Sequence, residues 1–337
     1  MSAPTSDDKG IGMGLTVAVT GPTGEIGISA VEALERNALV DHIIGMARRP
    51  FDPDSHKWTK TTYRRGDILD RETVDALVSD ADVVVHLAFI IMGSREESRR
   101  INLAGTRNVF EATVAAGRPR RLVYTSSVAA YGYHSDNPIP LTEDVPPRGS
   151  PEHYYSEQKA LCEAALAEIT AGSSLEVFVL RPCIVAGPQA PALDDAMPWH
   201  WLPGMRTAIR AVPLLKPLVP DPRIPLQLVH HDDVAAAIAL AATASAPAGP
   251  YNIAGDGVVS TTEVVAALGG RPVGVPQLAA AAASAAIAQL PFAPSALEWL
   301  HAVRTSVVMD TSKAKSVLGW TPKYTSAETL EALVSVV

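Results

Sequence analysis

The chain alternates short apolar runs with stretches in which apolar positions recur every three or four residues. The apolar runs, rich in Val, Ile and Leu, lie at 15–20, 42–47, 82–88, 121–127 and 175–182. Each run is typical of a buried strand, and helical spacing is found at roughly 98–116 and 155–171. Strands that alternate with helices predict an α/β fold with a doubly wound parallel sheet, in which ligands bind at the carboxyl ends of the strands.

The pattern changes after Pro182. From 183 to 227 Pro, Trp and Leu are frequent and periodicity fades, which favours a region that covers the substrate on top of the sheet. A strand and a helix are predicted again at 226–242, and another strand at 249–255. The expected division is a flexible tail at 1–13, a sheet domain at 14–182 to which 226–255 returns, and a smaller C-terminal substrate-binding subdomain at 183–225 and 256–337.

Composition and charge narrow the class of protein. Of the 337 residues 47% are hydrophobic and 19% are charged, which is an ordinary globular balance. The net charge of −8, with no long basic run, argues against binding to nucleic acid or to an anionic membrane. Cys162 and Cys183 form no CxxC pair, and the polar start of the chain is unlike a signal peptide, so we expect a cytoplasmic protein without disulfides. The Ala-rich stretch 277–290 is too short to span a bilayer and predicts a packed helix.

A glycine-rich turn, "TGPTGEIG", joins the first predicted strand to the first helix. Gly21 permits a tight turn, Gly24 allows close approach of a pyrophosphate, and Gly27 allows helix and strand to pack closely. The helix N-terminus adds unpaired N–H groups and the positive end of its dipole. The pattern predicts a dinucleotide site, with a purely structural turn as the other interpretation.

Two arginines lie where an NAD enzyme usually carries an acidic residue, about 20 residues beyond the last glycine. Arg48 and Arg49 could bind a 2′-phosphate bidentately, so NADP(H) is favoured while NAD(H) stays possible. The alternative is that these arginines only solvate the loop before Pro50.

Tyr155 and Lys159, in "YSEQK", lie four residues apart and would project from the same side of a helix. A cation beside the phenol would lower the pKa of Tyr155 toward working pH, as proton transfer requires. Tyr154 would point about 100° away. Pairs with this spacing also occur by chance, so the motif alone leaves Tyr155 as either a catalyst or a packed aromatic residue.

In sequence order the chain carries "TGPTGEIG", "GDILD", "DVVVHLA", "INLAGTRNVFEA", "LVYTSSVAAYG", "YSEQK", "LRPCIVAGP", "VHHDDVAAA", "YNIAG" and "DTSKAKSVLGWTPK". From end to end it resembles the extended short-chain dehydrogenase/reductases, the family of nucleotide-sugar epimerases, dehydratases and 3β-hydroxysteroid-type dehydrogenases. The resemblance implies a Rossmann-type sheet, and an NAD(P)-dependent oxidoreductase. It also implies that Tyr155 is the acid/base, that Lys159 lowers its pKa and contacts the nicotinamide ribose, and that Ser127 binds the same substrate oxygen.

The resemblance also implies which residues bind the cofactor. Asp67 would accept a hydrogen bond from the adenine amino group, Asn102 would support the cofactor from the helix behind, and the backbone near Cys183 would meet the carboxamide. The full set is Gly21, Thr23, Gly24, Glu25, Ile26, Gly27, Arg48, Arg49, Asp67, Ile68, Leu87, Ala88, Asn102, Tyr155, Lys159, Pro182 and Cys183.

Departures from the family pattern reduce the number of reactions that the chain is expected to catalyse. Val128 and Ala129 stand where the sugar-nucleotide dehydratases carry an Asp–Glu pair, which argues against dehydration. The segment beyond Cys183 is apolar, which favours a hydrophobic carbonyl or alcohol, although core packing explains part of it. The candidate substrate residues are Ser127, Trp199, His200, Trp201 and Arg223. Arg206, Arg210 or Arg223 could instead meet the diphosphate of a nucleotide sugar.

Two other chemistries are disfavoured. Cys183 has no His–Asp arrangement beside it and is expected to fill space as a small apolar residue. In "HHDD" (230–233), adjacent residues of a strand point to opposite faces, so no metal site is expected, and Asp232 or Asp233 is predicted to cap a helix. His86 is expected to be a satisfied histidine within the sheet.

Three functions remain in view. The first is an NADP-dependent oxidoreductase acting on a secondary alcohol or ketone, and the second is a nucleotide-sugar 4-epimerase that uses the same three residues. The third is a cofactor-sensing regulator without catalysis, which the presence of both Tyr155 and Lys159 disfavours. The partner is a small-molecule substrate, and the resemblance implies a homodimer formed through the helices at about 98–116 and 155–171.

Overall fold

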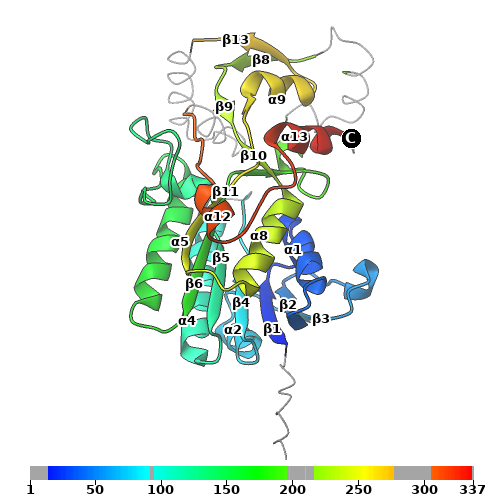
Figure 1. Ribbon diagram of the computed structural model, residues 1–337, viewed down its shortest axis with the longest axis vertical. Coiled ribbons are helices and arrows are strands. Elements are labelled where there is room, and N and C mark those ends of the chain that lie inside the picture. The colour runs from blue at the N-terminus through cyan, green and yellow to red at the C-terminus, as the bar shows by residue number, and fades with distance from the viewer. Residues whose placement is uncertain are drawn as a thin grey trace, which may run out of the picture.

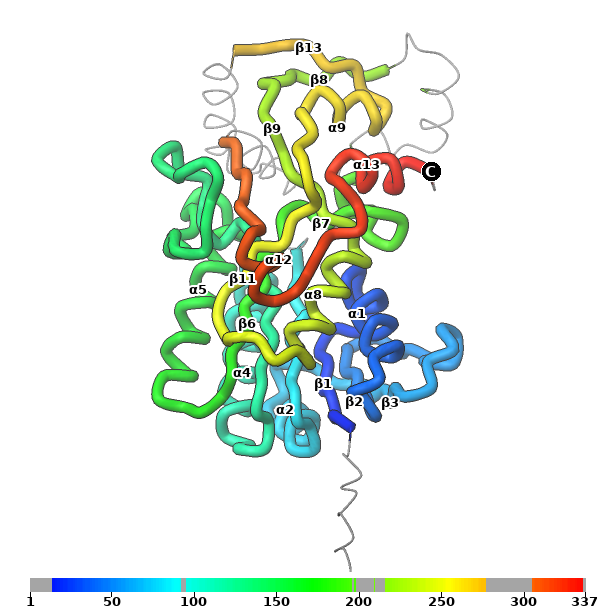
Figure 2. The backbone as a smooth tube through the Cα atoms, in the orientation of Figure 1, coloured from blue at the N-terminus to red at the C-terminus, as the bar shows by residue number. Residues whose placement is uncertain are grey.

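A seven-stranded parallel sheet forms the middle of the molecule, in the order β11-β6-β5-β4-β1-β2-β3 (Figures 1 and 2). The computed structural model describes residues 14–91, 95–195, 197, 209, 216–276 and 305–335. The strands are β1 Leu15–Thr20, β2 Val40–Ala47, β3 Thr61–Arg65, β4 Val83–His86, β5 Arg121–Thr125, β6 Glu176–Pro182 and β11 Gly249–Ile253. The order reverses between β1 and β4, which is where a doubly wound sheet opens a crevice for a ligand.

Helices cover both faces of the sheet because its strands alternate their side chains between two apolar layers. Val17 and Val19 of β1 belong to one core cluster with α1 and α8, whereas Ala18 belongs to a second cluster with α2, α4 and α5. These helices are α1 Glu25–Glu35, α2 Arg71–Val78, α4 Thr106–Ala116, α5 Tyr154–Thr170 and α8 His231–Thr243. The short helix α3, Arg95–Arg99, runs into α4 through a π-helical stretch at Arg100–Gly105.

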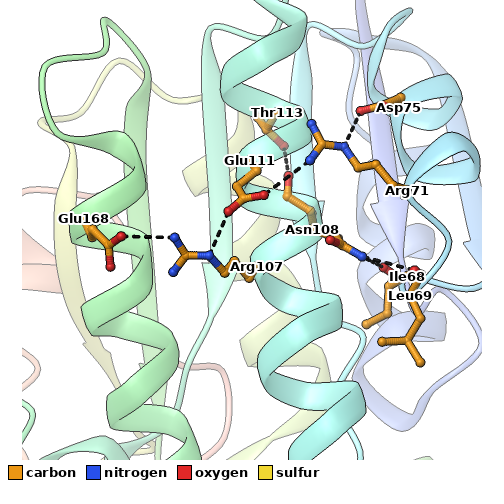
Figure 3. A network of polar contacts seen from close by, with 10 residues as sticks. Ile68, Leu69, Arg71, Asp75, Arg107, Asn108, Glu111, Thr113 and Glu168 are labelled. Atoms are coloured by element: carbon orange, nitrogen blue, oxygen red, sulfur yellow. Dashed lines mark hydrogen bonds and ion pairs between the residues drawn. The ribbon is translucent and has the colours of Figure 1, made fainter.

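Polar contacts link the helices of the second layer on their outer side (Figure 3). Arg107 of α4 binds Glu168 of α5 at 3.0 Å, and Glu111 of α4 lies 3.3 Å from Arg71 of α2. Asn108 donates to the carbonyl oxygens of Ile68 and Leu69, at 3.1 and 3.2 Å. The loop that precedes α2 is therefore fixed to α4, and with it the position of Asp67.

Smaller elements gather at the end toward which the parallel strands run, with β8, β9, β13 and α9 furthest from the sheet (Figure 1). The short strands outside the main sheet form three two-stranded pairs, β10 with β7, β12 with β9 and β13 with β8. Their bounds are β7 Ile184–Ala186, α6 Ala192–Asp195, β8 Leu218–Asp221, β9 Pro225–Leu226, β10 Leu228–His230, β12 Val259–Ser260, α9 Thr261–Ala267, β13 Arg271–Gly274, α12 Ser312–Ser316 and α13 Ser326–Ser335. A third apolar cluster lies among them.

The predicted α/β class and doubly wound parallel sheet are confirmed, and each predicted strand of the sheet is found within two residues of its expected bounds. The expected division into domains stays a prediction, and two observations bear on it. Residues 225–230 form β9 and β10, which pair outside the main sheet. Met309 and Trp320, expected in the subdomain, belong to the main core beside the sheet.

Some expectations concern residues outside the described ranges, namely the tail 1–13 and the Ala-rich stretch 277–290. Among the described residues, no helix combines the length and apolar character needed to cross a bilayer.

Candidate active site

The turn after β1 is built for close approach of an anion. Gly21 has a φ of 75°, and a Cβ there would lie 2.8 Å from the backbone nitrogen of Ala88. A Cβ on Gly27 would lie 2.1 Å from the Gly21 carbonyl oxygen, so α1 packs directly on the turn. Gly24 is the N-cap of α1, and no side chain caps the helix there. The uncapped N–H groups therefore fit the pyrophosphate of a dinucleotide, as the sequence predicts.

Glu25 and its neighbours line the start of α1. Thr23 and Ile26 are partly exposed and Glu25 is exposed. Although the Glu25 side chain is exposed, neighbouring groups remove part of the water around its carboxyl group, which raises its pKa, and repulsion from Asp195 adds to this. Glu25 lies at the positive end of a helix, which favours its charged form, so the two influences oppose each other.

The segment after β4 lies beside this turn. The backbone nitrogen of Leu87 donates to the carbonyl oxygen of Thr20 at 3.1 Å, next to Gly21. Asn102 is fully buried and exchanges two hydrogen bonds of 2.8 Å with the backbone of Ile90. It also donates to Gln158 of α5 at 2.8 Å. Asn102 thus supports residues 87–90 from behind, and its role toward a cofactor stays a prediction.

Arg48 and Arg49 are exposed just beyond β2, and their backbone is fixed from β3. The Tyr63 hydroxyl lies within hydrogen-bonding distance of the carbonyl oxygens of Ala47 and Arg49 and shares its one hydrogen between them. Arg65 Nε donates to the Arg48 carbonyl oxygen at 3.0 Å. Among the described residues none of these three arginines forms an ion pair, so their guanidinium groups are available to an anion.

Arg65 is a candidate that the sequence reasoning missed. The register of the parallel strands places it opposite Ala47, so it ends β3 next to Arg48. The parallel pairing of β3 with β2 is the signal that would have identified Arg65.

The remaining predicted cofactor residues lie at the edges of this crevice. Asp67 is partly buried and accepts from the Leu69 nitrogen at 3.0 Å, while Ile68 is buried against Gly105. Pro182 ends β6, and the backbone nitrogen of Cys183 donates to the Ile253 carbonyl oxygen at 2.9 Å. Burial raises the pKa of the Cys183 thiol strongly, which opposes a role as a nucleophile.

Ser127, Tyr155 and Lys159 come together at the carboxyl end of β5. Ser127 follows β5 and accepts from the Ala129 nitrogen at 3.1 Å, at the start of a 3-10 turn over Val128–Tyr131. Tyr155 and Lys159 project from the first turns of α5, and the Ser127 side chain lies close enough to the phenol to lower the pKa of Tyr155. Lys159 is 3% exposed, and its Nζ donates to the Thr125 carbonyl oxygen at 2.9 Å.

The pKa of Tyr155 differs from the expectation. Burial of the phenol raises the pKa of Tyr155 to about 12, although part of the residue stays accessible and the neighbouring Ser127 side chain opposes the rise. Burial lowers the pKa of Lys159 to about 8. The sequence predicts that Lys159 lowers the pKa of Tyr155, whereas in the chain alone the loss of solvent is the largest influence and Ser127 is the group that opposes it.

Aromatic side chains surround the phenol. The rings of Phe89 and Tyr155 meet edge to face with their centroids 5.6 Å apart, and His153 lies 6.3 Å from Tyr155. Tyr133 packs on His153 at 5.4 Å, and burial raises the pKa of its hydroxyl. Sequence reasoning missed these three residues, because they meet only where separate loops converge.

The proposed substrate residues are only partly covered by the structure. Trp199, His200 and Trp201 lie outside the described residues, as do Arg206 and Arg210. Arg223 is exposed in the turn between β8 and β9, with a φ of 57°. Its backbone nitrogen donates to Asp221 at 2.8 Å, and its guanidinium lies beside Gly274 of β13.

In the "HHDD" segment two expectations are wrong, namely the residue that caps α8 and the separation of adjacent side chains. The N-cap of α8 is His230, whose Nδ1 accepts from the Asp232 nitrogen at 3.2 Å, and not Asp232 or Asp233. The rings of His230 and His231 lie 4.1 Å apart, because the strand ends and the helix begins between them. Alternation therefore does not separate these residues, and possible ligand atoms of His230, His231 and Asp232 lie within 4.8 Å of one another.

Both histidines already have structural partners. His231 Nδ1 lies 2.8 Å from the Ser29 hydroxyl of α1, and His230 caps α8, so the pair joins the two helices of the first layer. His86, as predicted, is satisfied within the sheet: its nitrogens contact the hydroxyls of Thr20 at 2.6 Å and Thr106 at 3.0 Å.

Comparison with known proteins gives consistent matches. The model of the NAD dependent epimerase/dehydratase family matches residues 17–254. The UDP-glucose 4-epimerase of Vibrio cholerae is 28% identical over 218 residues, which cover 62% of this chain and 61% of that protein. The 3 beta-hydroxysteroid dehydrogenase type 7 of Homo sapiens is 31% identical over 193 residues, which cover 51% of this chain and 51% of that protein. The structure of MoeE5 in complex with UDP-glucose and NAD is similar with a TM-score of 0.70 at 26% identity, over 95% of this chain and 98% of that one.

Proposed function

Because the chain belongs to the NAD-dependent epimerase/dehydratase family, we propose that it is an NADP-dependent oxidoreductase that interconverts a secondary alcohol and a ketone on a hydrophobic small molecule. One observation carries the proposal. Ser127, Tyr155 and Lys159 lie together at the carboxyl end of β5, at the same edge of the sheet as the glycine turn of β1 and separated from it by β4.

The three side chains divide the proton chemistry between them. In ketone reduction the Tyr155 hydroxyl donates its proton to the carbonyl oxygen, which becomes the alcohol, and the hydroxyl of Ser127 binds the same oxygen. The nicotinamide supplies the hydride when it is bound. A pKa of about 12 keeps Tyr155 protonated at neutral pH, which suits it to act as the acid. The ammonium of Lys159 stabilises the phenolate that remains.

The surroundings of Tyr155 support an apolar substrate. Phe89 meets the phenol edge to face, Tyr133 packs on His153 beside it, and the buried Val128 and Ala129 directly follow Ser127. An apolar lining with a few convergent polar groups is typical of a site for a hydrophobic small molecule.

The preference for NADP rests on Arg48, Arg49 and Arg65. All three are exposed at the carboxyl ends of β2 and β3, and the described part of the chain gives none of them an ion-pair partner. A 2′-phosphate would provide a dianion to which planar guanidinium groups donate in pairs. MoeE5, by contrast, is described in complex with NAD, so the preference is a proposal about this chain's own residues.

Replacing Arg48 and Arg49 together with alanine is expected to weaken NADP binding about tenfold or more, because charge-assisted hydrogen bonds to the 2′-phosphate are lost. NAD binding should change little. Isothermal titration calorimetry with both cofactors measures the difference. Arg64→Ala is the matched control, because Arg64 lies next to Arg65 on the neighbouring strand β3 but its guanidinium donates to the Ala76 carbonyl oxygen on α2. Equal losses for NADP and NAD would show that the 2′-phosphate is recognised elsewhere.

A nucleotide-sugar 4-epimerase is the second candidate, and the relatives favour it as much as the first. The Vibrio cholerae protein is a UDP-glucose 4-epimerase, and MoeE5 is described with UDP-glucose. Such an enzyme would use Ser127, Tyr155 and Lys159 to remove and return a hydride on one substrate, without net oxidation.

The two candidates differ in how they treat the cofactor. The purified protein is first checked by absorbance and mass spectrometry for a retained cofactor, and then titrated with NADP, NADPH, NAD and NADH. Exchangeable NADP(H) that binds much more tightly than NAD(H) supports the oxidoreductase. NAD that stays bound through purification and turnover supports the epimerase and contradicts the role given to Arg48 and Arg49.

A further inference from the structure

Lys159 is a buried cation that forms no ion pair with a carboxylate among the described residues. It is 3% exposed, and the Thr125 carbonyl oxygen is the acceptor of its hydrogen bond, at 2.9 Å. Glu163, one turn further along α5, is bound by Arg181 at 2.6 and 3.0 Å and by Ser126 at 2.6 Å. Among the described residues no ion pair includes Lys159. Because burying a charge is costly, some other contact must stabilise the ammonium.

Aromatic rings supply that contact. The Nζ of Lys159 lies 3.7 Å from the centroid of Phe89, 5.2 Å from that of Tyr124 and 5.8 Å from that of Tyr155. The negative face of a ring attracts a cation within about 6 Å, and the attraction grows when water is excluded. Phe89 is the nearest of the three rings and therefore contributes most.

The position of Phe89 is fixed from both sides of the site. The next residue, Ile90, exchanges two hydrogen bonds with the buried side chain of Asn102. The Tyr154 hydroxyl donates to the carbonyl oxygen of Ile91. Phe89 is also in edge-to-face contact with Tyr155, so one ring touches both the cation and the phenol.

We propose that Phe89 is a positioning residue for Lys159: the face of its ring keeps the ammonium charged and directed at the Thr125 carbonyl oxygen, at the place from which it acts on Tyr155. The effect on Tyr155 rests on the proposed function, whereas the effect on Lys159 does not. The sequence motifs single out Tyr155 and Lys159 but contain no sign of this residue.

Phe89 is not the only group near Lys159 that could affect the charge of its ammonium. The titratable and charged side chains that face it or its neighbours are His86 of β4, Tyr124 of β5, Tyr155, Cys162 and Glu163 of α5, and Arg181 of β6. Burial keeps His86 neutral by lowering its pKa, and keeps Tyr124 and Cys162 neutral by raising theirs. Glu163 is the one anion in this set, and it raises the pKa of Lys159. Arg181 binds both of its oxygens, which limits what Glu163 contributes to the ammonium, and the ring of Phe89 lies over the ammonium itself.

The test is a direct titration of Lys159 in the protein without cofactor or substrate. Lysine labelled with ¹³C at Cε reports its own ionisation by NMR, and the Lys159 signal is assigned by its absence from Lys159→Met. In Phe89→Leu, which removes the ring and retains apolar volume, the pKa of Lys159 is expected to fall by about one unit. Phe89→Tyr, which restores a ring, is expected to return it to the wild-type value.

Two further variants keep the test decisive. Phe89→Met is a second apolar replacement without a ring, in case Phe89→Leu does not fold. Phe51→Leu makes the same change in the separate aromatic cluster with His56 and Trp58, and should leave the Lys159 titration unchanged. If Lys159 titrates at the wild-type pH in a folded variant that lacks the ring at position 89, the proposal is overturned.

The test of Phe89 can fail or succeed independently of the proposed reaction. A shifted Lys159 in Phe89→Leu, in a protein that reduces no ketone, would overturn the proposed reaction and leave the role of Phe89 intact. An unshifted Lys159 in an active enzyme would overturn the role of Phe89 alone. In an active enzyme the limb of the pH–kcat profile that Lys159 sets is expected to move with the NMR titration.

Discussion

Tyr155→Phe is expected to lower turnover about a hundredfold to ten-thousandfold, because the phenol oxygen carries the proton that the substrate oxygen receives. The substitution removes one oxygen and retains the ring that packs on Phe89. Cofactor affinity should therefore stay close to that of the wild type. Steady-state kinetics with a responsive ketone measures turnover, and calorimetry measures cofactor binding in the same preparation.

Tyr324→Phe is the matched control for this experiment. It removes the same oxygen from a tyrosine whose ring stacks on His230 at 4.0 Å, near the start of α8 and away from β5. Wild-type turnover is expected in this control. Wild-type turnover in Tyr155→Phe would contradict the assignment of the acid, and loss of cofactor binding in that variant would mean that the effect is structural.

Glu163→Ala is expected to lower the free energy of unfolding by about 3–5 kcal/mol, because it leaves the guanidinium of Arg181 buried without its partner. The two side chains are 5% and 7% exposed and form two hydrogen bonds, of 2.6 and 3.0 Å. Arg181 also lies over the ring of Tyr131, 4.6 Å from its centroid. Equilibrium unfolding in urea measures the loss.

Two comparisons give this result its meaning. Glu168→Ala breaks the 3.0 Å contact with Arg107 on the exposed face of α5, where solvent screens the pair, and should change stability very little. Replacing Glu163 and Arg181 together with methionine should recover much of the stability, because no buried charge then remains unpaired. A loss in Glu163→Ala no larger than in Glu168→Ala would contradict the importance of the pair.

The sequence predicts the sheet, and it predicts the side chains Ser127, Tyr155 and Lys159, because the strands and the motifs are local patterns. A buried strand of a parallel sheet is a continuous apolar run, and the runs at β1, β5 and β6 stand out without any knowledge of their neighbours. The turn at Gly21 and the pair of Tyr155 and Lys159 are likewise short motifs whose geometry is set within one helix or one turn.

Other parts of the site depend on contacts between distant segments. Phe89 meets Lys159 only because β4 and β5 are neighbours, and Arg65 meets Arg48 only because β2 and β3 pair in one register. Neither contact has a period or a motif. The pKa of Tyr155 also depends on how far the finished fold excludes water, which the spacing of Tyr155 and Lys159 does not express.

The errors at "HHDD" have a related cause. The alternation rule holds inside a strand, but β10 ends at His230 and α8 begins at His231, so the rule stops applying between these residues. Asp233 was expected as a cap, and instead its carboxylate accepts from the backbone nitrogens of Lys323 and Tyr324, at 2.8 and 3.0 Å.

The return of residues 308–320 to the main core has a consequence for the synthesis of the chain. The backbone of Leu141 exchanges hydrogen bonds of 2.7 and 2.8 Å with residues 308 and 310, and Trp320 donates to the Asp233 carbonyl oxygen at 2.9 Å. Translation proceeds from the N-terminus, so a nascent chain that already contains every strand of the main sheet still lacks Met309 and Trp320. The apolar surfaces that these side chains cover remain exposed until residues 309–320 have been synthesised and have left the ribosome.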